Sequence, residues 1–285
     1  MAERLNYQCK FEKYKEELIR LRRHFHRHPE LGLQEFETSA FIQEYLGKLG
    51  YRFRIVEPTG IIAEHPCQDE AAFAGKKKVV LRAEMDALPI QEQTGLSYAS
   101  ENAGVMHACG HDMHASMLLG VAKLLCEKKE EFAGTVKLIF QHSEDTLPGG
   151  AKELVEKGVM EDVDAIFGMH VFPTEGRPGE VAFHAGPVTT SVDLFEFEII
   201  GKGGHGSAPH TTHDPVLTGA QLVMLLQQIP ARYVDPLETV VFPVSTFHSG
   251  EAVNVIPAKA KLSGVARSYQ DSVREDVNKQ VYDII

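Results

Sequence analysis

Residues 104–114, with the sequence GVMHACGHDMH, carry three histidines, one cysteine and one aspartate within eleven positions. Thiolate, imidazole and carboxylate groups together suit Zn²⁺ or a similar first-row ion. The Cys-x-His spacing of Cys109 and His111 is not that of a zinc finger, so this stretch alone does not establish a metal site. A single histidine of this kind is more often a hydrogen-bonded core or loop residue than a metal ligand.

Two other segments carry side chains of the same kind. Glu144 and Asp145 follow the apolar run KLIFQ, and His170 ends the run AIFGMH. In an open α/β sheet the carboxyl ends of the strands meet at one crevice, where ligands bind. We therefore expect Cys109, His111, Asp145 and His170 to gather with Glu144 into one metal site.

The elements that must position these residues alternate between helix and strand over residues 1–185. Helical spacing predicts helices at 10–28, 36–49, 111–129 and 149–158, and apolar runs predict strands within 76–87, 134–141 and 163–170. Asp112 is placed to cap the third of these helices. Such alternation predicts an α/β fold with a mostly parallel sheet and helices on both faces, here a catalytic metal-binding domain.

The pattern changes in residues 186–285. Residues 191–203 alternate apolar and polar side chains, as a half-exposed strand does. Further strands are expected at 239–250 and 259–268, with helices at 214–230 and 271–285. These elements predict a second, smaller α+β domain with helices on one face of its sheet. The chain ends within the last predicted helix, so we expect this domain to be incomplete.

Composition narrows the function classes. The formal net charge of −11 argues against binding of nucleic acid, which needs a basic surface. No apolar run approaches the roughly 20 residues that cross a bilayer, and the charged N-terminus does not resemble a signal peptide. The four cysteines, Cys9, Cys67, Cys109 and Cys126, show no disulfide framework. We expect a cytoplasmic protein that binds neither nucleic acid nor membrane.

Six segments, in this order, resemble metal-dependent N-acyl-amino-acid amidohydrolases: RAEMDALPIQEQTG, GVMHACGHDMHASMLLG, VKLIFQHSED, DAIFGMHVFP, GKGGHGSAPH and GEAVNVIP. The group includes aminoacylases, hippurate hydrolases, plant auxin-conjugate hydrolases and N-acetyl-diaminopimelate deacetylases, and HRHPELGLQEFETSAFI also resembles it. The resemblance implies hydrolysis of a small N-acyl amino acid. It also implies two divalent metal ions, for which zinc or manganese is expected first and cobalt or nickel second. An inserted lid domain that forms a homodimer is implied as well.

Carried over by motif, Cys109, His111, Asp145 and His170 would be metal ligands, and Glu144 the general base. His205 would donate a hydrogen bond to the oxyanion in the partner subunit's site, unless it is an ordinary loop histidine. The ligands would be oriented by three residues, Asp86, Asp112 and His114. Asp112 could instead be a helix cap, and His114 an ordinary residue of a helix face. Two lid residues would hold the substrate carboxylate, unless they are ordinary strand residues: Asn254 and Arg267.

The chain departs from the resembling family at three points. Asp145 stands where a longer glutamate is usual, and His142 replaces a proline, so His142 is expected to face solvent or to add a ligand. The family's catalytic domain resumes after the lid with one more histidine ligand, which this sequence does not reach. The alternatives are a metallo-dipeptidase or carboxypeptidase, or a catalytically inactive, truncated metal-binding dimer. A nucleotide-binding protein is disfavoured, because no phosphate-binding loop is present.

Overall fold

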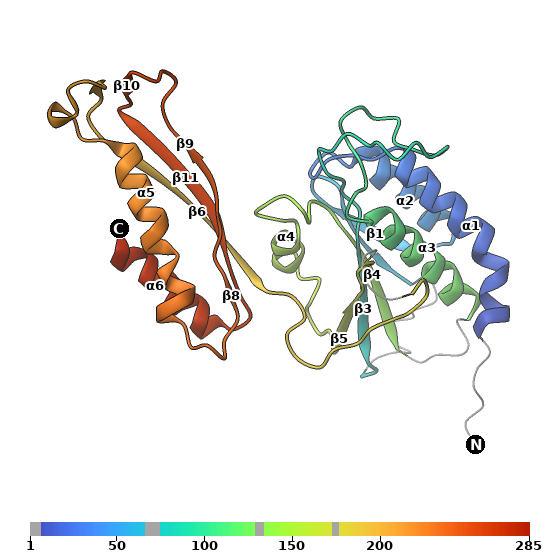
Figure 1. Cartoon of the computed structure of the whole chain (residues 1–285). Helices are drawn as coiled ribbons and strands as arrows, with labels where there is room; N and C mark the ends of the chain where they lie inside the picture. Colours follow the sequence, from blue (N-terminus) through green and yellow to red (C-terminus); the bar gives the residue numbers. More distant parts are fainter. Residues whose placement is uncertain (1–6, 66–74, 129–133, 173–176) are drawn as a thin grey trace. The chain divides into compact units, whose positions relative to one another are not determined.

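The structure, a computed structural model, describes residues 7–65, 75–128, 134–172 and 177–285. The chain forms two compact units, Met1–Gly176 and Arg177–Ile285, which are described separately (Figure 1). The predicted domain boundary, after residue 185, lies nine residues beyond the end of the first unit. Neither Cys109 nor Cys126 forms a disulfide, whereas Cys67 and the side chain of Cys9 lie outside the described part.

The first unit is built on a five-stranded sheet with the order β1-β2-β4-β3-β5. Its strands are β1 (Arg52–Val56), β2 (Gly60–Glu64), β3 (Lys78–Glu84), β4 (Thr135–Gln141) and β5 (Ala165–Gly168). β3 pairs in parallel with β4 and β5, whereas the β1–β2 hairpin and its pairing with β4 are antiparallel. The α/β class is confirmed. The sheet is mixed rather than mostly parallel because it includes the β1–β2 hairpin, which the sequence analysis did not predict.

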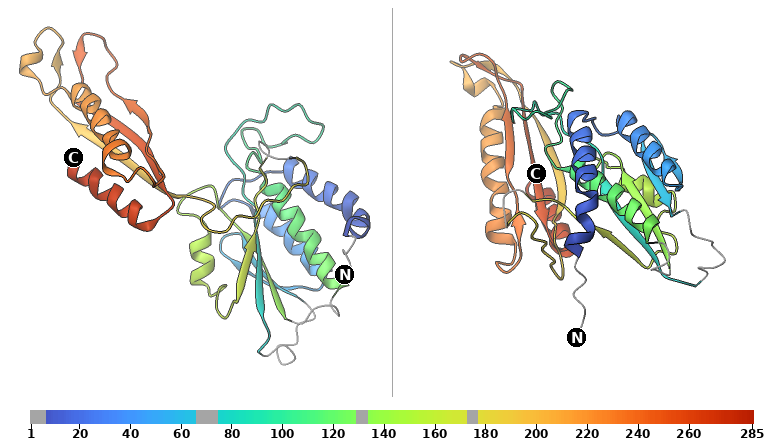
Figure 2. Two further views of the ribbon diagram at one scale, coloured as in Figure 1. Left: turned by 60° about the horizontal axis from the view of Figure 1, so that its bottom comes forward. Right: turned by 90° about the vertical axis from the view of Figure 1, so that its right-hand side faces the viewer.

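Helices cover both faces of this sheet unequally (Figures 1 and 2). α1 (Tyr7–Arg27), α2 (Phe36–Lys48) and α3 (His111–Glu127) lie on one face, and the short α4 (Ala151–Glu156) lies on the other. Alternation along β4 explains the two cores: Leu138 and Phe140 pack with the three helices, and Ile139 packs with Leu154 of α4. Burial of these side chains fixes which face of the sheet each residue of β4 lines.

The parallel register places the predicted site residues at one edge of the sheet. Glu84, the last residue of β3, is level with Gln141, the last of β4, and Arg82 is level with Gly168, the last of β5. The segments that follow these three strands contain Asp86, the Glu144–Asp145 pair and His170. The prediction that these strand ends converge is therefore confirmed.

The second unit is an antiparallel sheet of β6 (Ser191–Ile200), β11 (Lys259–Ser268), β8 (Val240–Val241) and β9 (Val244–His248). α5 (Pro215–Leu226) and α6 (Asp271–Ile284) pack against one face of it, where Phe195 and Phe197 of β6 join Leu226 and Val277. Asp214 accepts hydrogen bonds from the first free N–H groups of α5, which explains where that helix begins.

A separate two-stranded pair, β7 (Gly204–His205) and β10 (Val255–Ile256), extends the second unit beyond the end of β6. A 3₁₀ turn at Pro209–Thr211 follows β7, and a π-helical turn at Ile229–Tyr233 follows α5. Among the described helices, none is both long and apolar enough to cross a bilayer.

Candidate metal centre

Three predicted ligands come together in the first unit. Ligand atoms of Cys109, His111 and His170 lie within 4.8 Å of one another, and Cys109 Sγ is 3.3 Å from His170 Nε2. Cys109 belongs to the loop before α3, His111 is the first residue of α3, and His170 follows β5. The fold therefore brings together donors that are up to 61 residues apart in the sequence.

The hydrogen bonds of the two histidines place the ring proton on the same nitrogen, Nδ1, of each ring. His111 Nδ1 lies 3.0 Å from both the backbone oxygen and the carboxylate Oδ1 of Asp86, which only accept hydrogen bonds, so Nδ1 carries the proton. His170 Nδ1 likewise donates to the backbone oxygen of Val171, at 2.9 Å. Both Nε2 atoms therefore present a lone pair, as metal-binding histidines do when the other nitrogen donates to a carboxylate or carbonyl.

His111 Nε2 is the clearest sign that a cation belongs here. The residue is completely buried, and this atom has no hydrogen-bond partner among the described residues. Burial lowers the pKa of His111, but the hydrogen bond with Asp86 and the neighbouring Cys109 side chain outweigh it and raise the pKa to about 11. The surroundings thus favour a positive charge on Nε2, which a divalent ion supplies as well as a proton does, and the residues fit a metal ion.

Two carboxylates border this cluster on different sides. Glu144 Oε2 lies 3.7 Å from His111 Nε2, on the side of the lone pair. Asp145 Oδ2 lies 4.0 Å from His111 Nδ1, and a ligand-type group of Asp86, His111 and Asp145 is found there. Burial, and next the charge of Asp145, raise the pKa of Glu144. A carboxylate with a raised pKa is better suited to accept a proton near neutral pH.

His114 is close to the cluster but uses both ring nitrogens in hydrogen bonds. Val171 N donates to His114 Nε2 at 3.0 Å, and His114 Nδ1 therefore donates to Glu84 Oε2, at 2.8 Å. Burial raises the pKa of Glu84, but the hydrogen bond from His114 and the charge of Arg82 lower it to about 2. This arrangement supports an orienting role for His114 rather than metal ligation.

Two local expectations are wrong. Asp112 does not cap α3: the cap residue is Gly110, with φ of 90°, and the buried carboxylate of Asp112 pairs with His26 and Arg22 of α1. His142 does not face solvent and joins none of the ligand-type groups found among the described residues. It is buried, and its Nε2 lies 3.0 Å from Glu153 Oε2.

The remaining predicted residues lie in the second unit. His205 and Asn254 are neighbours there, because Gly206 N donates to the backbone oxygen of Asn254 at 2.8 Å. Arg267 lies near the opposite end of β11, which begins at Lys259. Arg267 is eight positions after Lys259 along the strand, which is a rise of about 27 Å. One small substrate could not contact both Asn254 and Arg267 of the same subunit.

Two buried residues beside the centre were not singled out by sequence analysis. Both ring nitrogens of His107 lack a partner among the described residues, and Glu35 accepts a hydrogen bond from Ser143, next to Glu144. His107 belongs to the same histidine-rich stretch, and Glu35 precedes a helix, where an acid is ordinary.

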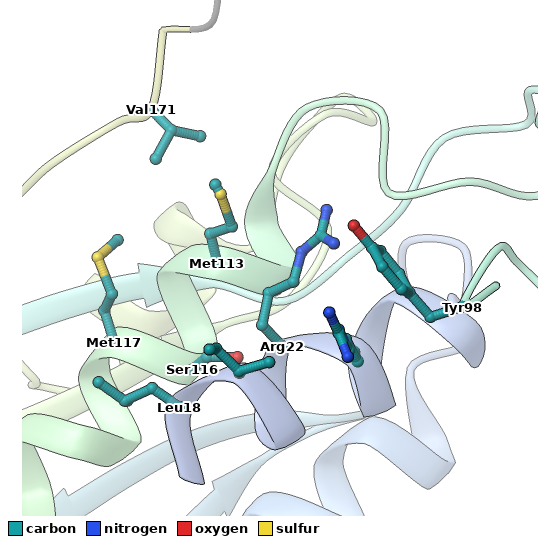
Figure 3. A pocket seen from close by; sticks show the side chains of 9 residues that line it. Leu18, Arg22, Tyr98, Met113, Ser116, Met117 and Val171 are labelled. Carbon is teal, nitrogen blue, oxygen red and sulfur yellow. The ribbon is translucent and has the colours of Figure 1, made fainter. Parts of the chain in front are cut away.

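A cavity of about 360 Å³ also lies between α1 and α3 (Figure 3). Its lining includes Arg22, Met113 and Val171 but none of the predicted site residues.

Residues 80–275 match the model of peptidase family M20/M25/M40. The N-acyl-L-amino acid amidohydrolase of Geobacillus stearothermophilus is 43% identical over 265 residues, which are 92% of this chain and 70% of that protein. The chain belongs to this peptidase family. The resemblance to metal-dependent amidohydrolases is thus confirmed, and with it the expectation of a metal-dependent hydrolase family.

Two further members extend the comparison. Thermostable carboxypeptidase 1 of Saccharolobus solfataricus is 42% identical over 258 residues, 90% of this chain and 65% of its own length. The structure of Bacillus subtilis YXEP, named as a dinuclear metal binding peptidase, matches 96% of this chain and 69% of its own. The TM-score is 0.75 and the identity 35%. The chain thus spans about two thirds of the length of these proteins.

Proposed function

We propose that this chain contributes to hydrolysis of the amide bond of N-acyl amino acids. Two divalent ions, zinc or manganese, would be held by Cys109, His111, Asp145 and His170. The observation that carries the proposal is the buried, unpartnered Nε2 of His111, with Cys109 on one side and Glu144 3.7 Å away. When bound, such ions activate a water molecule and polarise the acyl carbonyl.

Glu144 moves the proton in this proposal. Its raised pKa allows the carboxylate to take a proton from the attacking water and to deliver it to the leaving amine nitrogen. The carboxylate makes no hydrogen bond with any described residue, so its oxygens are free to meet the water. The side chain is 38% exposed, which leaves room for a substrate to approach.

His205 is proposed as the hydrogen-bond donor to the developing oxyanion. Ser207 N donates to His205 Nδ1 at 3.2 Å, so the ring proton is on Nε2, which has no partner in the described chain and is free to donate. We propose that it acts on the partner subunit's centre. Asn254, beside His205, is proposed to contact the same substrate. Arg267 lies too far from Asn254 to share this contact within one subunit, so we propose that it holds the substrate carboxylate from the subunit that contains the metal centre.

We propose that the second unit forms the lid and a homodimer. β6 is an edge strand of the described sheet, ten residues long, with Leu194 and Ile200 exposed. Leu217 and Met224 of α5 are exposed as well. A long edge strand with exposed apolar side chains is a template for pairing with a second chain.

Carboxypeptidase activity is the second candidate, because a relative 42% identical to this chain is named a carboxypeptidase. A substrate panel tests both proposals on one metal-loaded preparation. N-acetyl- and N-benzoyl-amino acids report amidohydrolase activity, and unblocked dipeptides and longer peptides report peptidase activity. Preference for the blocked amino acids is the expected result. Faster release of C-terminal amino acids from peptides would favour the second candidate, and metal binding without turnover of either class would contradict both.

A further inference from the structure

We propose that Glu35 is a positioning residue for Glu144, acting through the backbone of Ser143. This inference rests on the proposed function, in which Glu144 is the base. Ser143 N donates to Glu35 Oε1 at 2.7 Å, and the two residues are 108 positions apart in the sequence. Both are buried, and Ser143 directly precedes Glu144. A hydrogen bond at this amide therefore sets the direction in which the chain presents the base.

The backbone at Ser143 needs such support. Its φ is 45°, in the left-handed region that residues other than glycine rarely adopt. Three contacts hold it there: its N–H donates to Glu35, its oxygen accepts from Gly150 N at 3.0 Å, and its hydroxyl donates to the Thr146 oxygen at 3.2 Å. The bond to Glu35 is the only one of these three to an element distant in the sequence, so it ties the turn to the rest of the unit.

The side chain of Glu35 accepts this hydrogen bond from Ser143 rather than capping its own helix, α2. It occupies the cap position of α2, but its side chain caps nothing there. Glu30 instead accepts from Glu37 N and Thr38 N, at 3.1 and 2.7 Å. The second carboxylate oxygen of Glu35 accepts from Thr59 Oγ1 at 2.7 Å. No cation among the described residues pairs with this buried carboxylate, which is costly to bury without one.

The chain near Glu35 is also pressed against the turn. A Cβ added at Gly32 would come within 2.8 Å of Ser143 Oγ and 3.1 Å of Ser143 Cα. Only a glycine lets this segment approach so closely. Residues 32–35 therefore support Ser143 by contact and by hydrogen bond together.

A second buried carboxylate holds the other side of Glu144. Asp145 N donates to Asp86 Oδ2 at 3.0 Å, while Asp86 Oδ1 accepts from His111. The amides on both sides of Glu144 are thus fixed by Glu35 and Asp86, and the Glu144 side chain itself stays free. This arrangement orients the base without occupying the oxygens that the reaction needs.

Three variants test the role of Glu35. Glu35→Ala removes the acceptor for Ser143. Glu35→Gln keeps an amide oxygen for Ser143 and lets the amide N–H donate to Thr59. Thr59→Val is the matched control, because it removes a buried hydrogen bond of the same carboxylate but leaves the bond to Ser143. For Glu35→Ala we expect kcat to fall about 10- to 100-fold with KM within about twofold, since displacement by about 1 Å has an effect of this size. Glu35→Gln and Thr59→Val should keep kcat within about threefold.

Hydrogen exchange of the metal-free chain provides a readout independent of activity. The amides of Ser143 and Asp145 should exchange faster in Glu35→Ala but not in Thr59→Val, when variants of matched unfolding midpoint are compared. If Glu35→Ala does not fold, Gly32→Ala presses on the same turn while keeping Glu35, and the same local exchange and loss of kcat are expected. Unchanged exchange and kcat in Glu35→Ala, or equal losses in Thr59→Val, would overturn the inference. If the wild type shows no turnover but the Ser143 and Asp145 amides exchange faster in Glu35→Ala, the contact is upheld and the proposed function is rejected.

Discussion

The backbone N–H of Val171 donates to Nε2 of His114, at 3.0 Å, and so ties the residue after His170 to helix α3. His114 in turn donates to Glu84 at the end of β3. One histidine therefore links a strand, a helix and the segment that carries a proposed metal ligand. Its two nitrogens are both occupied, which separates its role from that of His111.

This link predicts that His114→Ala weakens metal binding without removing a ligand. The affinity should fall about 10- to 100-fold, as for other residues that orient ligands, while the stoichiometry at saturating metal stays unchanged. Titration with Zn²⁺ against a competing chelator measures the change. Ser116→Ala is the control, because Ser116 is a buried polar residue of the same helix, and its hydroxyl donates to the Asp112 backbone oxygen within that helix. A stoichiometry reduced in His114→Ala would identify His114 as a ligand instead.

Cys109→Ser should reduce the metal affinity at least tenfold, because a hydroxyl is a poor replacement for a thiolate ligand. Cys126→Ser offers a matched comparison, since Cys126 also forms no disulfide and its thiol donates to the Leu49 oxygen, away from the centre. Equal metal affinity of Cys109→Ser and the wild type would remove Cys109 from the ligand set.

Glu144→Gln should keep the metal content and lower kcat by about 10²- to 10⁴-fold, the usual contribution of a general base. The amide has the same shape, and the bonds that hold Ser143 and Asp145 involve the backbone, so the turn should be unchanged. Asp145→Asn should instead lower metal affinity. Turnover that survives in Glu144→Gln would show that another group takes the proton.

The buried pair of His26 and Asp112 predicts a pH dependence of stability. The hydrogen bond with Asp112, at 2.7 Å, raises the pKa of His26 above 6.5, although burial opposes it. Because the pKa of His26 is higher in the folded than in the unfolded chain, the protonated pair stabilises the fold fully below pH 6.5. This contribution is lost as the pH rises through the folded-state pKa. The unfolding free energy of the wild type should therefore fall relative to that of His26→Gln between pH 6 and pH 9, as urea titrations would show. A difference independent of pH would contradict the assignment.

Much of the catalytic unit could be predicted because its helices and strands have clear hydrophobic periods. α2, α3 and β4 occur within two residues of their predicted bounds, and the convergence of Glu144 and His170 follows from parallel strands alone. The β1–β2 hairpin was missed although arginines at positions 52 and 54 alternate with Phe53 and Ile55; β1 is only five residues long and largely exposed.

The errors at Asp112 and His142 have a common cause. Asp112 is an ordinary helix cap by sequence, but its partner His26 is 86 residues away. His142 is buried because Gly60 and Gly150 leave room for its ring, which a Cβ at either position would meet within 2.8 Å. Contacts between distant segments decide both positions, as they do for Glu35 and Ser143.

The most direct test of the metal centre is elemental analysis of the purified chain, with hydrolysis of N-acetyl- and N-benzoyl-amino acids assayed on the same sample after addition of Zn²⁺ or Mn²⁺. We predict about two ions per chain and metal-dependent turnover, both reduced in His111→Ala. A chain that binds no metal, or that binds as much metal in His111→Ala as in the wild type, would contradict a centre built around His111.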